Sequence, residues 1–201
     1  MKNFFHDYSY NIVKMFVNQF AISIFGVSLT LATTQAHIES SGFDKFTLVV
    51  SIFAVAFYLF LIYTLAWEIG AKDKISVDVG KKPYRPHLGI LLSLVANIPN
   101  LLAALLYAIA TLIGSESMMF VVRLFATLIQ GMYFGIITAI SLPIGGTYVQ
   151  LNSLWPTFFL MAIPAMLTSW IAYFLGHRNF RIFAFLASKP KENSDQPTLK
   201  K

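Results

Sequence analysis

The hydrophobic positions of this chain fall into long runs that short polar stretches separate. About 20 apolar residues in a helix, at ~1.5 Å each, cross the hydrocarbon core of a bilayer. Five runs reach that length, and they cover residues 12–35, 46–67, 88–114, 118–141 and 155–175. The pattern predicts an all-α polytopic membrane protein whose residues 1–187 form a single transmembrane helical bundle.

The composition agrees with that prediction. Hydrophobic residues make up 57% of the 201 residues, charged residues make up only 12%, and the mean hydropathy is +0.66. A soluble domain is roughly half apolar and about a quarter charged, so half of the expected charge is missing here. A chain with this balance is solvated by lipid, and the bilayer is its first expected partner.

The longest polar stretch between two apolar runs is residues 68–87. It holds five of the 15 Lys and Arg residues, and Gly70 near its start predicts the end of the preceding helix. Basic loops between membrane helices mark the cytoplasmic side, so we expect this loop and the N-terminus to be cytoplasmic. Its first residues are candidates for docking a soluble protein, the alternative being a solvated loop. They are Glu68, Lys72, Asp73 and Lys74.

Five plain crossings conflict with the distribution of positive charge. With the 68–87 loop inside, a fifth crossing leaves the C-terminal tail outside, although that tail is basic. Either the rule fails at this end, or residues 88–114 form a re-entrant hairpin instead of a crossing. A kinked crossing is favoured over the hairpin, because proline kinks are common in membrane helices. Residues 188–201 are polar and predict a disordered tail.

Polar and small residues recur at helical spacing, on one face, in four of the five segments. An unpaired amide in an apolar environment costs ~1–3 kcal/mol or more, so these faces meet each other or line a wet cavity. One interpretation is hydrogen bonding between helices, and the other is a solute-binding surface. The candidate lining residues are Gln19, Asn97, Asn100, Thr127, Gln130 and Arg123.

The sharpest single feature is the sequence Asn97-Ile98-Pro99-Asn100. Pro99 has no N–H to donate and crowds the carbonyl group of Val95, which is then free to accept another hydrogen bond. Two asparagines beside a broken helix suit a midplane binding site of the kind found in transporters. The alternative is a kink that Asn97 patches locally.

Arg123 is the one charged residue well inside a predicted segment. A charge within the membrane is a functional hypothesis by default. Arg123 lies about one and a half helical turns from the start of its segment, however. Snorkelling to the interface, with Glu116 as an ion-pair partner, is therefore the competing explanation.

No catalytic constellation is visible in the sequence. No Asp, Glu or His lies in the middle of a segment, and the H-E-x-x-H, G-x-S-x-G and Walker patterns are absent. The chain has no cysteine, and its four histidines lack metal-ligand spacing. We therefore predict no enzyme activity, metal or cofactor. Nucleic acid is not an expected partner either, because the positive-inside rule explains the net charge.

The stretch Trp67–Asp73, together with Ala96–Asn100 after it and Asn18-Gln19 and Ile24–Gly26 before it, resembles a family of small uncharacterised bacterial multi-span membrane proteins. The resemblance covers mainly the first half of the chain. It implies a location in the bacterial cytoplasmic membrane, and it carries no activity and no catalytic residue.

Two functions are consistent with these features. The first is a small-solute transport or binding component without catalytic activity. The second is an assembly or regulatory membrane protein that docks a partner through its basic cytoplasmic loop. That partner would be a membrane protein, a cytoplasmic protein or a second copy of this chain.

Overall fold

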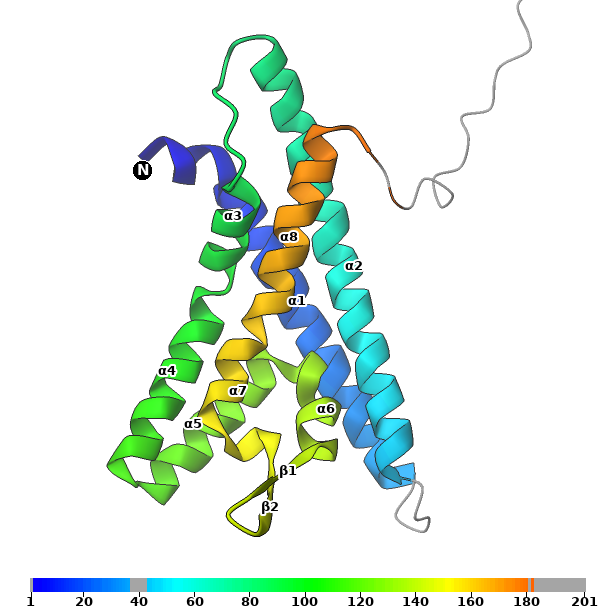
Figure 1. Cartoon of the computed structure of the whole chain (residues 1–201), viewed down its shortest axis with the longest axis vertical. Coiled ribbons are helices and arrows are strands. Elements are labelled where there is room, and N and C mark those ends of the chain that lie inside the picture. The colour runs from blue at the N-terminus through cyan, green and yellow to red at the C-terminus, as the bar shows by residue number, and fades with distance from the viewer. Residues whose placement is uncertain (1, 37–42, 181, 183–201) are drawn as a thin grey trace, which may run out of the picture.

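The structure is a computed structural model that describes residues 2–36, 43–180 and 182. Helices run along the long axis of the molecule (Figure 1). Among the described residues, three helical stretches are long and apolar enough to cross a membrane, and two bent helix pairs are as well. The prediction of an all-α polytopic membrane protein is confirmed.

The two longest helices are α1 (Lys2–Ala36) and α2 (Phe43–Asp78), and both run the length of the molecule (Figure 1). The sequence predicted that the second helix ends near Trp67 and Gly70 and that residues 68–87 form a loop. That prediction is wrong for residues 68–78, which continue α2 as far as Asp78. The basic connection is the shorter stretch 79–87.

Gly70 does not end α2, because it serves helix packing instead. α2 crosses α8 (Ala162–His177) at this point. A Cβ atom on Gly70 would overlap the carbonyl oxygen of Tyr173, and one on Gly176 would overlap that of Trp67. The two glycines thus let the helix backbones touch, which extends the buried contact beyond the predicted end of the helix.

The third apolar segment is a kinked crossing. It consists of α3 (Leu88–Ala96) and α4 (Ile98–Ile113), which meet at Asn97 with a bend of 57°. Both helices continue toward the same end of the molecule (Figure 1), so the alternative of a re-entrant hairpin over residues 88–114 is wrong. Proline lies in the first turn of α4, where its missing N–H removes no helical hydrogen bond.

The fourth apolar segment does not cross, contrary to the prediction of a helix over 118–141. α5 (Glu116–Ile129) is followed by the 3₁₀ turn η1 (Gly131–Tyr133) and by α6 (Phe134–Ala139), with a bend of 92°. The chain enters the bundle along α5 and returns along α6 to the end from which it came (Figure 1). This segment, and not the third, is the re-entrant one.

Two glycines allow the turn between α5 and α6. A Cβ atom on Gly131 would overlap the carbonyl oxygen of Ser23 in α1. One on Gly135 would lie 2.9 Å from the carbonyl oxygen of Thr47 in α2. The G-x-x-x-G spacing therefore packs the bend between two helices of the same chain.

Ser51 of α2 pairs the backbone groups that the bend leaves free. Its hydroxyl donates to the carbonyl oxygen of Met132 at 2.9 Å and accepts from the N–H of Ile136 at 3.2 Å. Non-helical backbone is tolerated at membrane depth only where protein or water satisfies it. One serine in the apolar part of α2 supplies that partner here.

A short antiparallel hairpin follows α6. Its strands are β1 (Ser141–Ile144) and β2 (Thr147–Gln150), and Ser141 pairs with Gln150. Gly145 and Gly146 form the turn with φ values of 59° and 84°, which glycine adopts without strain. The 3₁₀ turn η2 (Leu151–Ser153) then leads into α7 (Trp155–Leu160) and α8.

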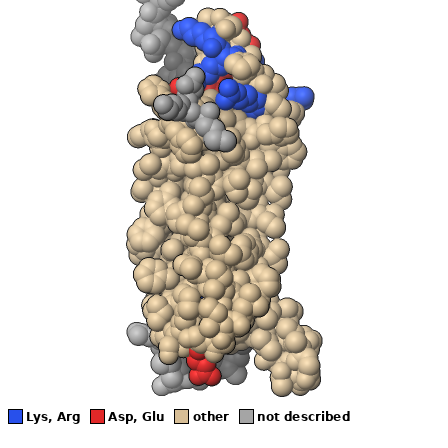
Figure 2. All heavy atoms as spheres, turned by 90° about the vertical axis from the view of Figure 1, so that its left-hand side faces the viewer, with Lys and Arg blue, Asp and Glu red and all other residues tan. Residues whose placement is uncertain are grey.

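The re-entrant segment resolves the conflict in charge. The start of α1, the 79–87 connection and the end of α8 all lie at one end of the molecule (Figure 1). Arg178 after α8 therefore joins Lys72, Lys81 and Lys82 at this end, which we call the basic end. Figure 2 shows the Lys and Arg residues of one face gathered there, above a broad middle band without charged residues. The tail over 188–201 lies outside the described residues.

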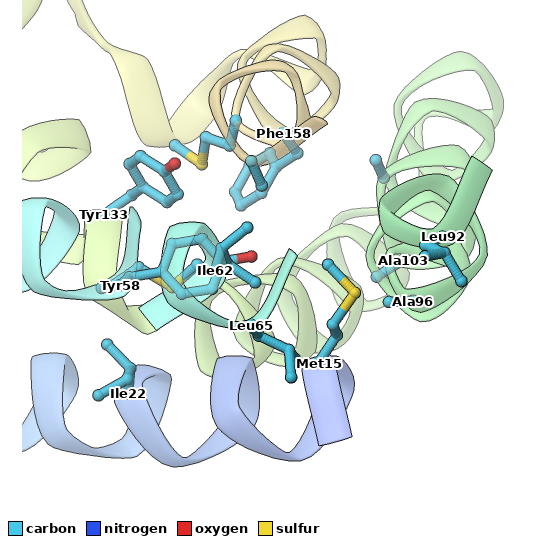
Figure 3. Close-up of a cluster of buried hydrophobic side chains, with 14 of the residues drawn as sticks. Met15, Ile22, Tyr58, Ile62, Leu65, Leu92, Ala96, Ala103, Tyr133 and Phe158 are labelled. Atoms are coloured by element: carbon cyan, nitrogen blue, oxygen red, sulfur yellow. The ribbon is translucent and has the colours of Figure 1, made fainter. Parts of the chain in front are cut away.

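The core is one apolar cluster that draws on most of the helices. Figure 3 shows side chains of α1, α2, α3, α4, η1 and α7 projecting into it. The largest fully buried side chains include both apolar and amide groups. They are Tyr58, Tyr173, Phe158, Met15, Ile62, Leu92, Met132, Ile137, Gln19, Gln130, Asn97 and Asn100.

Gly70→Ala and Gly176→Ala will each destabilise the bundle. The added methyl group overlaps backbone and forces α2 and α8 apart, at a cost of about 1–3 kcal/mol. The measurement is the melting temperature of the purified protein in detergent. Ser117→Ala, at an exposed position of α5, is the control and will leave it unchanged. Equal melting temperatures for all three variants would contradict the close crossing.

Single cysteines will show which positions share a side of the membrane. The natural chain has no cysteine, so Lys81→Cys, Ser117→Cys, Ser153→Cys and Arg178→Cys can be labelled without background. We expect Lys81→Cys and Arg178→Cys to react from one side, and the two serine replacements from the other. If residues 116–139 cross fully, Ser153→Cys reacts together with Lys81→Cys instead.

Candidate functional site: a buried polar cluster at the helix breaks

The break between α3 and α4 carries two buried asparagines. Asn97 Nδ2 donates to the carbonyl oxygen of Ser93 at 2.8 Å, which is the local patch of the kink that the sequence suggested. Asn100 Nδ2 donates to Asn97 Oδ1 at 2.7 Å. Asn100 Oδ1, however, is buried without a hydrogen-bond partner among the described residues. The two asparagines therefore hydrogen-bond to the backbone at the kink and to each other. One acceptor atom, Asn100 Oδ1, has no partner in the described structure.

Gln130 lies at the second break, between α5 and η1. Its side chain is 2% exposed, and its Nε2 donates to the carbonyl oxygen of Phe158 in α7 at 3.2 Å. Its Oε1 accepts no hydrogen bond from the part of the chain that the structure describes. Phe158 itself precedes a third, slighter interruption at Met161, between α7 and α8. The Gln130 amide thus links the break between α5 and η1 to α7, just before the interruption at Met161.

Tyr58 and Tyr133 bring two phenol groups to the same place. Figure 3 shows both rings with Phe158 in one cluster, where α2, η1 and α7 meet. The Tyr58 hydroxyl lies near the side chain of Asn97, but without the geometry of a hydrogen bond. Both hydroxyl groups are buried, and neither has a partner within the described residues.

Gln19 of α1 is the sixth member, and it is 1% exposed. It lies one helical turn, or ~6 Å, from Ser23, at 1.5 Å per residue. The Ser23 hydroxyl donates to the carbonyl oxygen of Ile129, immediately before Gln130. Gln19 therefore lies about one helical turn from the α5–η1 break. Its Nε2 is buried with no acceptor among the described residues.

These side chains form what we call the polar cluster: Gln19, Tyr58, Asn97, Asn100, Gln130 and Tyr133. Within the described chain it leaves three donor groups unused, on Gln19, Tyr58 and Tyr133, and two amide oxygens, on Asn100 and Gln130. A buried polar atom without a partner costs about 1–3 kcal/mol. The cluster carries no charged side chain, so its chemistry suits a neutral group that both donates and accepts hydrogen bonds.

Two of the predicted lining residues lie elsewhere. Arg123 and Thr127 line a cavity of about 430 Å³ between α1, α5 and the segment that follows the hairpin. The predicted stripe of α5 is thus divided, because the helix breaks at Gln130 and only that residue reaches the cluster. No ion pair joins Arg123 to Glu116 in the described structure.

The four candidate docking residues do not form one surface. Glu68 and Lys72 make an exposed ion pair at 2.6 Å, one turn apart on α2, and Lys74 is half-buried. Asp73 points the other way and is 8% exposed. The interpretation of Asp73 as part of a solvated loop is therefore wrong.

Asp73 instead ties three helices together at the basic end. Its Oδ2 accepts from the hydroxyl of Tyr8 in α1 at 2.8 Å and from that of Tyr173 in α8 at 3.1 Å. Lys82 pairs with Asp7 at 2.7 Å beside it, and a cavity of about 230 Å³ lies between them. The Tyr8–Asp73–Tyr173 contact is a clasp that holds α1 and α8 to α2.

Sequence reasoning missed the tyrosines of both sites. Tyr58 lies in the most uniformly apolar segment, and an aromatic ring there is normally core packing. Tyr173 also lies in a long apolar run, where an aromatic ring is normally core packing. A usable signal was present for the clasp, because Gly70 and Asp73 are three residues apart on one face of α2, as Tyr173 and Gly176 are on α8.

Comparison with known proteins adds no relative. No protein-family model, curated protein or solved structure matches this chain. Among the described residues, no group of three or more histidine and carboxylate side chains is placed to hold a metal ion. The functional argument therefore rests on the geometry of the polar cluster.

Removing either phenol of the clasp will destabilise the fold. Tyr8→Phe and Tyr173→Phe each delete one hydrogen bond to a buried carboxylate, worth about 1.5–3 kcal/mol. The loss will show as a lower melting temperature in detergent. Asp78→Asn, on the exposed end of the same helix, is the control and will change little.

The same pair provides a stricter test. With Asp73→Asn in the background, the phenol deletions will cost much less than they do alone, because the shared acceptor has lost its charge. If the stability losses of the tyrosine substitutions and of Asp73→Asn simply add, the tyrosines act independently of Asp73.

Proposed function

We propose that this integral membrane protein is a transport or binding component for a small neutral polar solute, without catalytic activity. The carrying observation is the polar cluster, in which five side chains from four segments each have a buried atom without a partner among the described residues. Burying a polar atom without a partner lowers the stability of the fold. A bound solute with hydrogen-bond donors and acceptors pairs with these atoms and offsets that loss.

The position of the cluster supports this function. It lies at the breaks of the third and fourth apolar segments and beside the interruption of α7–α8. Transporters place their sites at discontinuous helices near the midplane, where side-chain and backbone polar groups are both available. The absence of charge on the cluster side chains favours solutes such as polyols or small amides over ions.

The basic end is proposed to face the cytoplasm. Lys and Arg gather there, which the positive-inside rule associates with the cytoplasmic side. The start of α1, the 79–87 connection and the end of α8 would then be inside. The resemblance of residues 67–73 and 96–100 to a bacterial family suggests that the membrane is a bacterial cytoplasmic membrane.

A second candidate is an assembly or regulatory protein that docks a partner at the basic end. The exposed Lys81 and the exposed Glu68–Lys72 pair favour it, since such side chains are available to a cytoplasmic protein. A membrane protein or a second copy of the chain would dock along the apolar sides. In this case the polar cluster would only hold the helices together.

Tyr58→Phe and Tyr133→Phe separate the two candidates. Each removes a hydroxyl group that pairs with nothing in the described structure and keeps the shape of the ring. If the hydroxyls serve a solute, the melting temperature without solute will stay equal or rise. Passage of glycerol or urea into proteoliposomes, followed by light scattering, will fall about two- to tenfold, as the loss of one hydrogen bond implies.

Tyr148→Phe is the matched control, because this side chain is 82% exposed on the hairpin. It will leave both readouts unchanged. Two outcomes would contradict the proposal: wild-type proteoliposomes no more permeable than protein-free ones, or both variants melting several degrees lower with unchanged permeability.

A further inference from the structure

The cavity beside Arg123 is separate from the polar cluster and has a different character. It opens between α1 and α5 near the hairpin end, and its volume is about 430 Å³. Polar groups of Gln150, Asn152 and Ser153 form one part of its lining. Residues of α5 and α1, among them Phe120, Leu124 and Leu31, form most of the rest, together with Phe134 of α6.

Arg123 brings a positive charge into this cavity. The residue is half-buried, and no hydrogen bond or ion pair joins its guanidinium to any described residue. Arginine is never neutral in a protein, and its planar fork matches phosphate and carboxylate oxygens in bidentate geometry. The charge is therefore available to an anionic group that enters from outside the chain.

The apolar side of the cavity faces outward. Phe120 is 61% exposed, Leu124 is 50% exposed and Leu31 is 52% exposed, although all three are large and apolar. Such side chains at the surface of a membrane bundle contact acyl chains. The cavity thus combines a cation and polar groups on one side with a lipid-facing apolar wall on the other.

The depth of Arg123 fits the boundary between headgroups and acyl chains. It lies eight residues after Ser115, the N-cap of α5, which is ~12 Å along the helix. Asn152 and Ser153, which share the cavity, belong to the short 3₁₀ turn η2 between the hairpin and α7. An arginine at this level can hold a phosphate while its neighbours hold chains.

We propose that this cavity binds one phospholipid with a net negative headgroup. Arg123 pairs with the headgroup phosphate, and Phe120, Leu124 and Leu31 contact its acyl chains. The site lies at the end of the molecule opposite the basic end. General attraction of anionic lipid to the many Lys and Arg residues there therefore does not account for it. The inference is independent of the proposed solute function.

Native mass spectrometry of the full chain in detergent tests the proposal. Phosphatidylglycerol and phosphatidylcholine with identical acyl chains are added in turn, and the fraction of protein with one bound lipid is measured. Wild type will prefer phosphatidylglycerol. Arg123→Gln will bind it about tenfold more weakly. Arg123→Lys will retain only part of the preference, because the charge remains but the bidentate geometry is lost.

Arg178→Gln is the matched control, since it removes the same charge at the basic end. It will leave the first bound phosphatidylglycerol in place. Loss of that lipid in Arg178→Gln but not in Arg123→Gln would overturn the proposal, as would equal binding of the two lipids by wild type.

A second arm distinguishes a lipid from a free anion. Inorganic phosphate at millimolar concentration is added to wild type, and the melting temperature is compared with that in phosphatidylglycerol. The lipid will raise it, and inorganic phosphate will not. An equal rise with inorganic phosphate that Arg123→Gln abolishes would show a free-anion site and contradict the lipid assignment.

Discussion

Every break in a helix of this bundle frees backbone and side-chain polar groups at a depth where water is scarce, and those groups must find partners. Much of the architecture follows from how they do so. Asn97 bonds back to Ser93 and closes the kink of the third segment. Ser51 pairs two backbone groups at the bend of the fourth. After these local repairs, five buried atoms of the polar cluster still have no partner in the described chain, and the functional argument rests on that remainder.

The fold also requires helix backbones to approach one another closely, and glycine residues allow that approach. Gly131 lets the re-entrant bend approach α1, while Gly70 and Gly176 let α2 and α8 cross without a gap. Because the bend turns back, α7–α8 runs toward the basic end, and Arg178 joins the other cations there. The charge distribution, the re-entrant segment and the clasp at Asp73 are thus consistent with one another.

Much of this fold was predictable from the pattern of apolar residues, because segment length and hydrophobicity are enough to define membrane helices. The charge conflict also raised a segment that does not cross as one of two explanations, although the sequence favoured five crossings. It did not indicate which segment, since Pro99 marks a kink visibly, whereas the bend after Gln130 depends on contacts of Gly131 with a helix more than a hundred residues earlier. The four amides of the cluster were predictable because an amide in an apolar run is conspicuous. Tyr58 and Tyr133 were not, since a buried tyrosine in a long apolar run resembles ordinary core.

The most direct measurement on the polar cluster is whether water reaches it. Asn100→Cys and Gln130→Cys can be made in a chain that has no other cysteine, and both can be treated with a small water-soluble methanethiosulfonate reagent. Only a thiolate reacts, and a thiolate forms only where water or a polar site stabilises it. We predict that both cysteines react, more slowly than exposed Ser117→Cys and much faster than Ala104→Cys in the apolar core of α4. Cysteines at 100 and 130 as inert as the one at 104 would mean that the cluster is sealed, and that the solute-binding account is wrong.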